Sequence, residues 1–306
     1  MVYGAAKKLL ENNRQAIAMS EQEFVEISKS FFVDADYKTA FSELGLTSID
    51  AIFSFNAGSN LAKDNLAGFR SRLQFEINSP RSSAPITVFL KRYNRPPVLV
   101  QLRNWLCHRR RTSWGFSDFE AANKLSALGI NTPKTICYGE QRGVFLEKRS
   151  FIIIEKIPNA ESLERKLPEC FNRPATVENL KLRRAFIGRL AAFVRKFHET
   201  NYRHRDLYFS HIFYGDDGNF YLIDLSRVFK PVIWRQRFRI KDIAQLYYSA
   251  PGRYFSDMDR LRFYFRYTGQ SKLTRKDKVF IRKVINKARR MARHDTKRGR
   301  PVPFAR

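Results

Sequence analysis

Five polar residues have the types and the order that phosphoryl transfer requires. That reaction needs a cation on the phosphates, a carboxylate that orients and deprotonates the attacking hydroxyl, and ligands for a divalent metal ion. The chain supplies such groups in order, as Lys91, Glu120, Asp206, His211 and Asp224. Each residue by itself is a weak signal, so the prediction depends on the elements that carry them.

Hydrophobic periodicity and turn residues indicate how these residues are placed. Lys91 ends a predicted strand that follows another strand across a Ser/Pro turn, and Asp206 follows a long amphipathic helix. His211 and Asp224 flank a predicted β-hairpin whose turn is rich in Asp, Gly and Asn. The expected elements are strands 69–77, 86–91, 151–155, 212–215 and 220–223 and helices 117–129, 182–198 and 274–293.

This order resembles the protein-kinase signature: a strand lysine, a helix glutamate, an H-R-D loop and a metal-binding aspartate. Two alternatives stay open. Glu120 could instead complete a capping box with Ser117, where it would bond a backbone N–H and leave Lys91 unpaired. His211 could be a structural histidine of the loop, although it occupies the position of the kinase metal-binding asparagine.

Longer strings sharpen the resemblance to the lipopolysaccharide kinase (Kdo/WaaP) family, which includes the core heptose kinases. They cover residues 60 to 250, and comprise Phe89–Lys91, Phe119–Ile130, Ser150–Glu155, Val194–His198, His204–His211, Leu222–Arg227 and Lys241–Ser249. The resemblance implies an α+β, two-lobed protein-kinase-like fold, with a small strand-rich N-lobe and a helical C-lobe.

The resemblance also implies roles for individual residues. Asp206 would be the catalytic base and Lys91, with Glu120 as its partner, would bind the phosphates of ATP. His211 and Asp224 would hold Mg²⁺, and the backbone from Glu155 to Ile157 would bind adenine. Imidazole is a softer ligand than Mg²⁺ prefers, so Mn²⁺ is also considered.

The chain departs from the kinase pattern at two places. No G-x-G-x-x-G motif precedes Lys91, where only Gly58 and Gly68 are available to a phosphate loop. Ser226 replaces the glycine of the kinase D-F-G motif.

Length and composition divide the 306 residues into four predicted parts. These are a helical N-terminal cap (1–55), an N-lobe (56–157), a C-lobe (158–270) and a basic helical tail (271–306). The three scattered cysteines suit a reducing cytosol better than a disulfide framework. No run of apolar residues is long enough to span a bilayer, so we expect a cytoplasmic protein, peripheral on the inner membrane face.

The formal net charge of +28 favours a polyanionic partner. The arginine-rich insertion 92–112 contains no acidic residue and could form a helix lying on an anionic membrane, or simply a solvated loop. Its candidate acceptor or membrane residues are Arg103, Arg109, Arg110 and Arg111. The expected partner is the lipopolysaccharide inner core. A nucleic-acid-binding protein is an alternative that the charge favours, but no nucleic-acid-binding motif is present.

The remaining alternatives concern the acceptor of the phosphoryl group. Only 17 residues separate Asp224 from Asp242, which is expected to open a helix, and no A-P-E motif lies between them. A protein kinase needs room there for its activation segment, so a sugar is the favoured acceptor and a protein is the alternative. A kinase-like pseudoenzyme is disfavoured because Lys91, Asp206 and Asp224 are all present.

Overall fold

The computed structural model describes residues 23–61, 68–171 and 176–303. The chain divides into two compact units. The first unit comprises Met1–Ile157 together with Asp224–Arg227, and the second comprises Pro158–Ile223 and Val228–Arg306.

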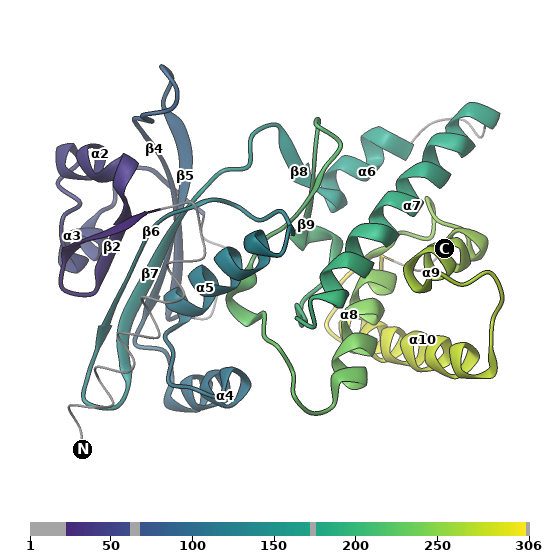
Figure 1. The fold of residues 1–306 in the computed structure, drawn as a ribbon. Helices are drawn as coiled ribbons and strands as arrows, with labels where there is room; N and C mark the ends of the chain where they lie inside the picture. Colours follow the sequence, from purple (N-terminus) through teal and green to yellow (C-terminus); the bar gives the residue numbers. More distant parts are fainter. Residues whose placement is uncertain (1–22, 62–67, 172–175, 304–306) are drawn as a thin grey trace. The chain divides into compact units, whose positions relative to one another are not determined.

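The first unit is built on one antiparallel sheet of seven strands, in the order β1-β2-β6-β7-β5-β4-β3 (Figure 1). The strands are β1 (Phe24–Ser28), β2 (Phe31–Asp34), β3 (Ser59–Asn60), β4 (Arg70–Ile77), β5 (Ile86–Asn94), β6 (Thr135–Arg142) and β7 (Glu147–Glu155). The predicted strands 69–77, 86–91 and 151–155 correspond to β4, β5 and β7, although β5 continues three residues past Lys91.

The expectation of a wholly helical segment 1–55 is wrong for its described N-terminal part. Residues 24–34 form two strands that join the edge of the sheet, where β2 pairs with β6. Phe31 and Val33 are completely buried, and the aromatic and β-branched residues at positions 24–34 favour the strands that form here. Helices do follow, as the 3-10 turn η1 (Ala35–Tyr37), α2 (Lys38–Glu43) and α3 (Ile49–Ser54). Residues 1–22 lie outside the described part of the chain.

Alternate residues of the central strands point to two separate hydrophobic clusters. Phe151 and Ile153 pack in a cluster that includes residues of α2 and α3, whereas Ile152 and Ile154 pack with Phe119 of α5 (Trp114–Ala127). Figure 1 shows α5 against one face of the sheet and the short helices α2 and α3 against the other. A shorter helix, α4 (Val98–His108), precedes α5. The sheet is therefore covered on both faces and fixes the position of α5.

The second unit is mainly helical and contains a three-stranded sheet in the order β10-β9-β8. The predicted hairpin is present, as β9 (Ile212–Gly215) and β10 (Phe220–Leu222). Asp242 does not open a helix as expected, because α8 begins at Arg235. The remaining elements of this unit are β8 (Ala160–Ser162), α6 (Leu163–Phe171), α7 (Val177–Glu199), η2 (Phe209–His211), α8 (Arg235–Ser249), α9 (Asp257–Thr268) and α10 (Arg275–Thr296). The 3-10 turn η3 (Leu225–Arg227) belongs to the first unit. The strand-rich N-terminal sheet and the helical C-terminal part confirm the predicted fold class.

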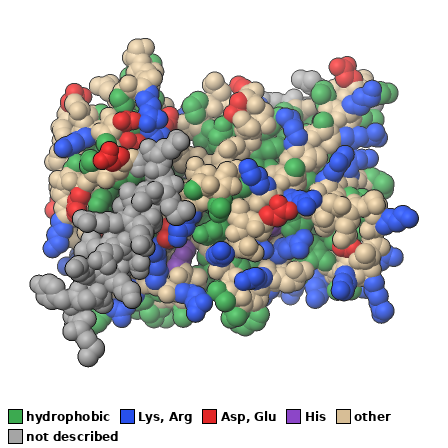
Figure 2. Space-filling model, viewed as in Figure 1, with side chains coloured by type: hydrophobic (Ala, Val, Ile, Leu, Met, Phe, Trp, Pro, Cys, Tyr) green, Lys and Arg blue, Asp and Glu red, His purple; other side chains and the backbone are tan. Residues whose placement is uncertain are grey.

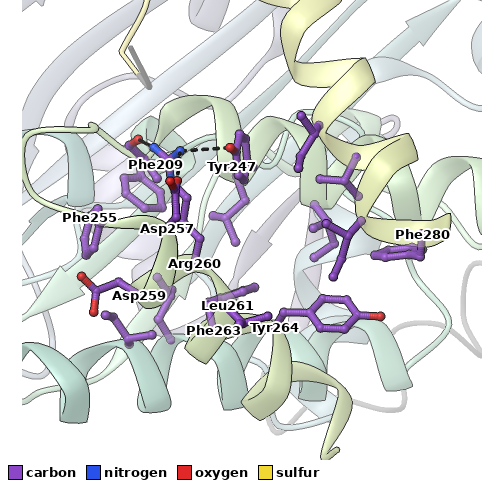
Figure 3. A pocket seen from close by; sticks show the side chains of 18 of the residues that line it. Phe209, Tyr247, Phe255, Asp257, Asp259, Arg260, Leu261, Phe263, Tyr264 and Phe280 are labelled. Carbon is purple, nitrogen blue, oxygen red and sulfur yellow. Dashed lines mark hydrogen bonds and ion pairs between the residues drawn. The ribbon is translucent and has the colours of Figure 1, made fainter. Parts of the chain in front are cut away.

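An apolar cavity of about 310 Å³ lies among the helices of the second unit (Figure 3). Its walls come from α7, α8, α9 and α10 and include Leu190, Leu246, Tyr264, Phe280 and Val284. On one side Arg260 donates a hydrogen bond of 3.0 Å to the Tyr247 hydroxyl. The basic helix α10, which the sequence assigns to a separate tail, thus completes the core of this unit.

Basic side chains are spread over the visible surface of the protein rather than gathered in one place (Figure 2). Among the described residues, no helix has both the length and the apolar composition needed to cross a membrane.

Candidate active site

Lys91 is a buried cation in the middle of the first unit's sheet. It lies on β5 between β4 and β7, where it pairs with Arg72 and Ile152. The residue is only 7% exposed, so its ammonium group requires a partner inside the protein. That partner is Asp118, whose Oδ2 lies 2.8 Å from Lys91 Nζ.

The predicted ion pair between Lys91 and Glu120 is therefore wrong. Glu120 instead binds Arg110 Nη2 at 2.5 Å and Lys124 Nζ at 2.7 Å. Residues two positions apart on a helix do not share a face, so only one of Asp118 and Glu120 can point to the sheet. The register of α5 along the sheet decides in favour of Asp118.

The start of α5 explains this register, because the helix begins at Trp114 rather than at Ser117. Ser113 caps the helix and accepts a bond of 3.1 Å from the Phe116 N–H, so the predicted capping box does not form. The Trp114 N–H donates to Glu147 Oε2 at 3.1 Å, and the Gly115 N–H donates to Ser150 Oγ at 2.9 Å. The first three backbone donors of the helix are thus bound, two of them by side chains from β7.

Close packing and burial accompany this attachment. A Cβ atom on Gly115 would lie 2.6 Å from the carbonyl oxygen of Phe151, so only glycine fits here. Glu147 is 6% exposed, and burial raises its pKa to about 7 although the bonds from Ser150 and Trp114 act in the opposite direction. α5 is consequently fixed one turn before Asp118.

Asp118 also binds the segment that carries Asp224. Its Oδ1 accepts a hydrogen bond of 3.1 Å from the Leu225 N–H. Asp224 has a positive φ of 57° and its Oδ2 lies 3.3 Å from Arg72 Nη2. Arg72 and Lys91 are directly opposite on neighbouring strands and share one face of the sheet. Two cations and two carboxylates are thereby assembled within the first unit.

The second unit holds the loop that carries Asp206. Asp242 of α8 is completely buried and accepts bonds from the backbone N–H groups of His204 at 2.9 Å and Arg205 at 2.8 Å. Burial alone would raise the pKa of Asp242, but hydrogen bonding and the charge of His198 hold this pKa below its ordinary value. Arg205 has a positive φ of 70°. Asp242 therefore stabilises a strained backbone immediately before Asp206.

The carboxylate of Asp206 is partly exposed and is positioned by α8. Its Oδ1 accepts a bond of 3.4 Å from Gln245 Nε2 and lies 3.7 Å from Lys241 Nζ. Gln245 also accepts a bond of 3.2 Å from the Leu207 N–H. A side chain with these contacts is held in one orientation and can accept a proton from a bound hydroxyl group.

His211 is bonded to the same loop. Its Nδ1 lies 2.7 Å from the carbonyl oxygen of Asp206. In the neutral ring this bond places the hydrogen on Nδ1 and the lone pair on Nε2, the atom that can bind a metal ion. The backbone of His211 accepts a 3.1 Å bond from the Ile223 N–H, directly before Asp224.

A carboxylate such as that of Asp224 suits a divalent ion that keeps most of its own water. In the described part of the chain, no three or more His, Cys, Asp or Glu side chains gather in a way that could hold a metal. Mg²⁺ is commonly bound by one or two carboxylates together with phosphates and water, and the Asp224 carboxylate fits that requirement. The imidazole of His211 suits Mn²⁺ better.

The other predicted residues occupy separate places. Glu155 ends β7, and burial raises its pKa, while Ile157 is buried at the end of the first unit. Gly58 lies against β4, where an added Cβ would meet the Gln74 carbonyl oxygen at 2.4 Å. Residues 62–67, within the stretch between Gly58 and Gly68, lie outside the described residues.

The four candidate arginines of the insertion 92–112 do not all face solvent. Arg110 turns toward α5, where it binds Glu120 and lies 5.0 Å from the centre of the Phe116 ring. Arg103, Arg109 and Arg111 are exposed to solvent.

Sequence reasoning missed Asp118, Asp242 and Gln245. Asp118 lay inside the supposed capping box, two residues before the glutamate that the kinase pattern favours. Asp242 and Gln245 both lie within a string that carries the family resemblance. They are three residues apart and so share one face of a helix, and this spacing was the signal that could have identified them.

Comparisons with known proteins identify the family of the chain. The sequence model of the family described as "Lipopolysaccharide kinase (Kdo/WaaP) family" matches residues 98–267, more than half of the chain. A lipopolysaccharide core heptose(I) kinase WaaP of Escherichia coli K12 is 30% identical over 207 residues, covering 65% of this chain and 75% of the relative. The kinase of the same name from Pseudomonas aeruginosa is 30% identical over 159 residues, covering 49% of this chain and 58% of the relative.

A solved structure described as "WaaP in complex with acyl carrier protein" has the same fold. It superposes with a TM-score of 0.65 at 21% identity, and the match covers 86% of this chain and 99% of that one. The chain therefore belongs to the lipopolysaccharide kinase (Kdo/WaaP) family and is a phosphotransferase with an alcohol group as acceptor.

Proposed function

We propose that this protein transfers the γ-phosphoryl group of ATP to a hydroxyl group of an inner-core sugar of lipopolysaccharide, at the cytoplasmic face of the inner membrane. Heptose is favoured over Kdo because the similar curated proteins are named heptose(I) kinases. The observation that carries the proposal is the Asp118 carboxylate, which binds both Lys91 and the backbone beside Asp224.

In the proposed reaction the first unit binds the nucleotide. Asp118 accepts one N–H of the Lys91 ammonium group, whose other N–H groups bind phosphate oxygens. The backbone from Glu155 to Ile157 binds adenine, and Asp224 with His211 would hold Mg²⁺ or Mn²⁺. When bound there, such an ion would neutralise charge on the β- and γ-phosphates.

Asp206 acts on the acceptor. Its carboxylate accepts the proton of the sugar hydroxyl while the hydroxyl oxygen attacks the γ-phosphorus. The bond from phosphorus to the β–γ bridging oxygen breaks, and ADP leaves with the electron pair. Gln245 and Lys241 keep Asp206 oriented during this step, and Asp242 holds the loop backbone.

The strongly basic surface supports a location beside anionic lipid, where the acceptor is embedded. An acyl carrier protein is a further candidate partner, because the solved relative is described in complex with one. Co-purification of the full chain with its host's acyl carrier protein would test that partnership.

Phosphoryl transfer to a defined acceptor tests the function. Purified protein receives ATP labelled at the γ-phosphate, a divalent ion and core saccharide lacking phosphate. We expect Asp206→Asn to reduce kcat by about 10²–10⁴-fold, because the isosteric change removes the base. Asp216→Asn is the matched control, since that carboxylate lies on the exposed hairpin turn of the second unit, where it pairs with Lys166.

Two results would refute the proposal. One is near-normal kcat in the Asp206→Asn protein with the wild-type unfolding transition. The other is transfer to peptide substrates and to no core saccharide, which would make the protein kinase alternative correct.

A further inference from the structure

Helix α4 buries polar side chains and exposes apolar ones, the reverse of an ordinary surface helix. The side chains that face the protein include Gln101 and Asn104, which are 2% and 5% exposed. Three leucines spaced along the opposite side face solvent: Leu99 is 81% exposed, Leu102 is 41% exposed and Leu106 is 79% exposed. A helix of a monomeric soluble protein normally buries its leucines and exposes its amides.

Specific hydrogen bonds fix this orientation. Gln101 Nε2 donates to the carbonyl oxygens of Pro96 at 2.7 Å and Glu147 at 3.2 Å, and its Oε1 accepts from the Glu147 N–H at 2.8 Å. Asn104 Nδ2 donates to Ser117 Oγ at 3.3 Å. Rotating the helix to bury the leucines would leave these buried polar groups without partners. The exposed leucines are therefore a fixed feature of the fold.

A second apolar element lies beside α4. The turn between β6 and β7 exposes Val144 by 89% and Phe145 by 68%. The guanidinium group of Arg111 lies 5.7 Å from the centre of the Trp105 ring and 5.8 Å from that of Phe145. Arg111 therefore connects the helix and the turn, and the two form one surface.

This surface is basic at its edges. Arg103, Arg109 and Arg111 are exposed on or directly after α4, and no acidic residue occurs between positions 92 and 112. In Figure 2 hydrophobic and basic side chains meet at the lower edge of the view, where Figure 1 places α4.

We propose that α4 and the β6–β7 turn form a membrane-docking surface, named here the α4 surface and consisting of Val98, Leu99, Leu102, Leu106, Val144 and Phe145 with Arg103, Arg109 and Arg111. The apolar side chains enter the boundary between headgroups and acyl chains, and the arginines bind lipid phosphates. Its occupant is an anionic bilayer rather than a protein, because the aliphatic side chains project from two convex elements and carry a basic edge. The proposal rests on the proposed function, since the surface would bring the enzyme to its lipid-borne acceptor.

Co-sedimentation with vesicles tests the proposal. The full chain is mixed with vesicles of phosphatidylglycerol and phosphatidylethanolamine, or of phosphatidylcholine alone, over a salt series. Leu99→Gln with Leu106→Gln should lower the partition coefficient on anionic vesicles at least tenfold. The matched control is Val177→Gln with Leu182→Gln, which changes two exposed apolar residues of α7 in the second unit and should leave binding unchanged.

The charges are tested separately. Replacing Arg103, Arg109 and Arg111 by glutamine should weaken binding to anionic vesicles and reduce its dependence on salt. Its control removes the same charge from exposed α10 positions, with Arg282, Lys283 and Arg289 replaced by glutamine. Phe145→Ala provides an independent check on the turn, should the leucine variant fail to fold.

Activity on a soluble core saccharide is measured in every variant, which separates this proposal from the proposed function. Lost vesicle binding with kcat retained supports the α4 surface. Wild-type vesicle binding in both the leucine and the Phe145 variants would overturn it. The proposal would also be overturned if an acidic protein or a nucleic acid displaced the wild-type protein from vesicles and the leucine variant no longer bound that competitor. Absence of saccharide phosphorylation in the wild type would instead refute the proposed function.

Discussion

Replacing Asp118 by asparagine should damage the protein far more than the equivalent change at Glu120. The Lys91 and Asp118 side chains are only 9% and 4% exposed and lie 2.8 Å apart. Breaking a buried ion pair by removing one partner costs about 3–5 kcal/mol, because the remaining charge stays buried without compensation. The amide oxygen of the Asp118→Asn side chain would still accept the bond from the Leu225 N–H, so the loss concerns the charge and not the shape of the side chain.

The change from Glu120 to glutamine provides the comparison. The partners of Glu120 are much more exposed, with Arg110 at 31% and Lys124 at 42%. Ion pairs of this kind contribute about 0–1 kcal/mol each. We therefore expect Glu120→Gln to cost about 1 kcal/mol of stability and to leave the phosphate-binding lysine in place.

Urea unfolding and steady-state kinetics measure the two effects. Asp118→Asn should lower the free energy of unfolding by about 3 kcal/mol and raise KM for ATP at least tenfold, a change that corresponds to about 1.4 kcal/mol. Glu120→Gln should change KM for ATP by no more than about twofold, which corresponds to much less than the 1.4 kcal/mol of a tenfold change. Equal losses in both variants, or a larger loss at Glu120, would show that Asp118 is not the partner of Lys91.

Two further changes test how α5 is held on the sheet. The pKa of Glu147 is raised from 4.5 to about 7 by burial, so the native state binds its proton more tightly than the unfolded state and this stabilisation is lost as pH rises from about 4.5 through 7. Glu147→Gln should remove that dependence. The free energy of unfolding of the wild type, minus that of the variant, should therefore fall by up to about 3 kcal/mol between pH 5 and pH 8. A difference that does not change with pH would contradict the assignment. Gly115→Ala forces a Cβ to within 2.6 Å of the Phe151 carbonyl oxygen, so it should displace α5 and reduce kcat/KM for ATP at least tenfold, about 1.4 kcal/mol; unchanged kinetics would show that the spacing does not position Asp118.

The sequence by itself placed Lys91 on a strand and placed His211 and Asp224 at the two ends of a hairpin. It also identified the family. These features are local, because each depends on only a few neighbouring residues. They are the strand alternation, the Asp-Asp-Gly-Asn turn and the short spacing from Asp206 to His211. The catalytic roles given to them remain proposals that the experiments above address.

Only the tertiary structure decided which carboxylate binds Lys91. The local pattern Ser117 to Glu120 has the form of a capping box, but α5 begins earlier because Glu147 and Ser150, more than thirty residues away, bind its first N–H groups. Residues 24–34, which we expected in a helical cap, instead form two strands, and β2 pairs with β6 at the edge of the sheet.

Long-range contacts also decided the surface. The sequence left the insertion 92–112 open between an amphipathic basic helix and a solvated loop, and it could not say which side of such a helix faces outward. The hydrogen bonds of Gln101 to Pro96 and Glu147 select that side. A pattern of residues determines which faces a helix has, whereas the partners available elsewhere in the chain determine which face is buried, because each buried polar group must be bonded.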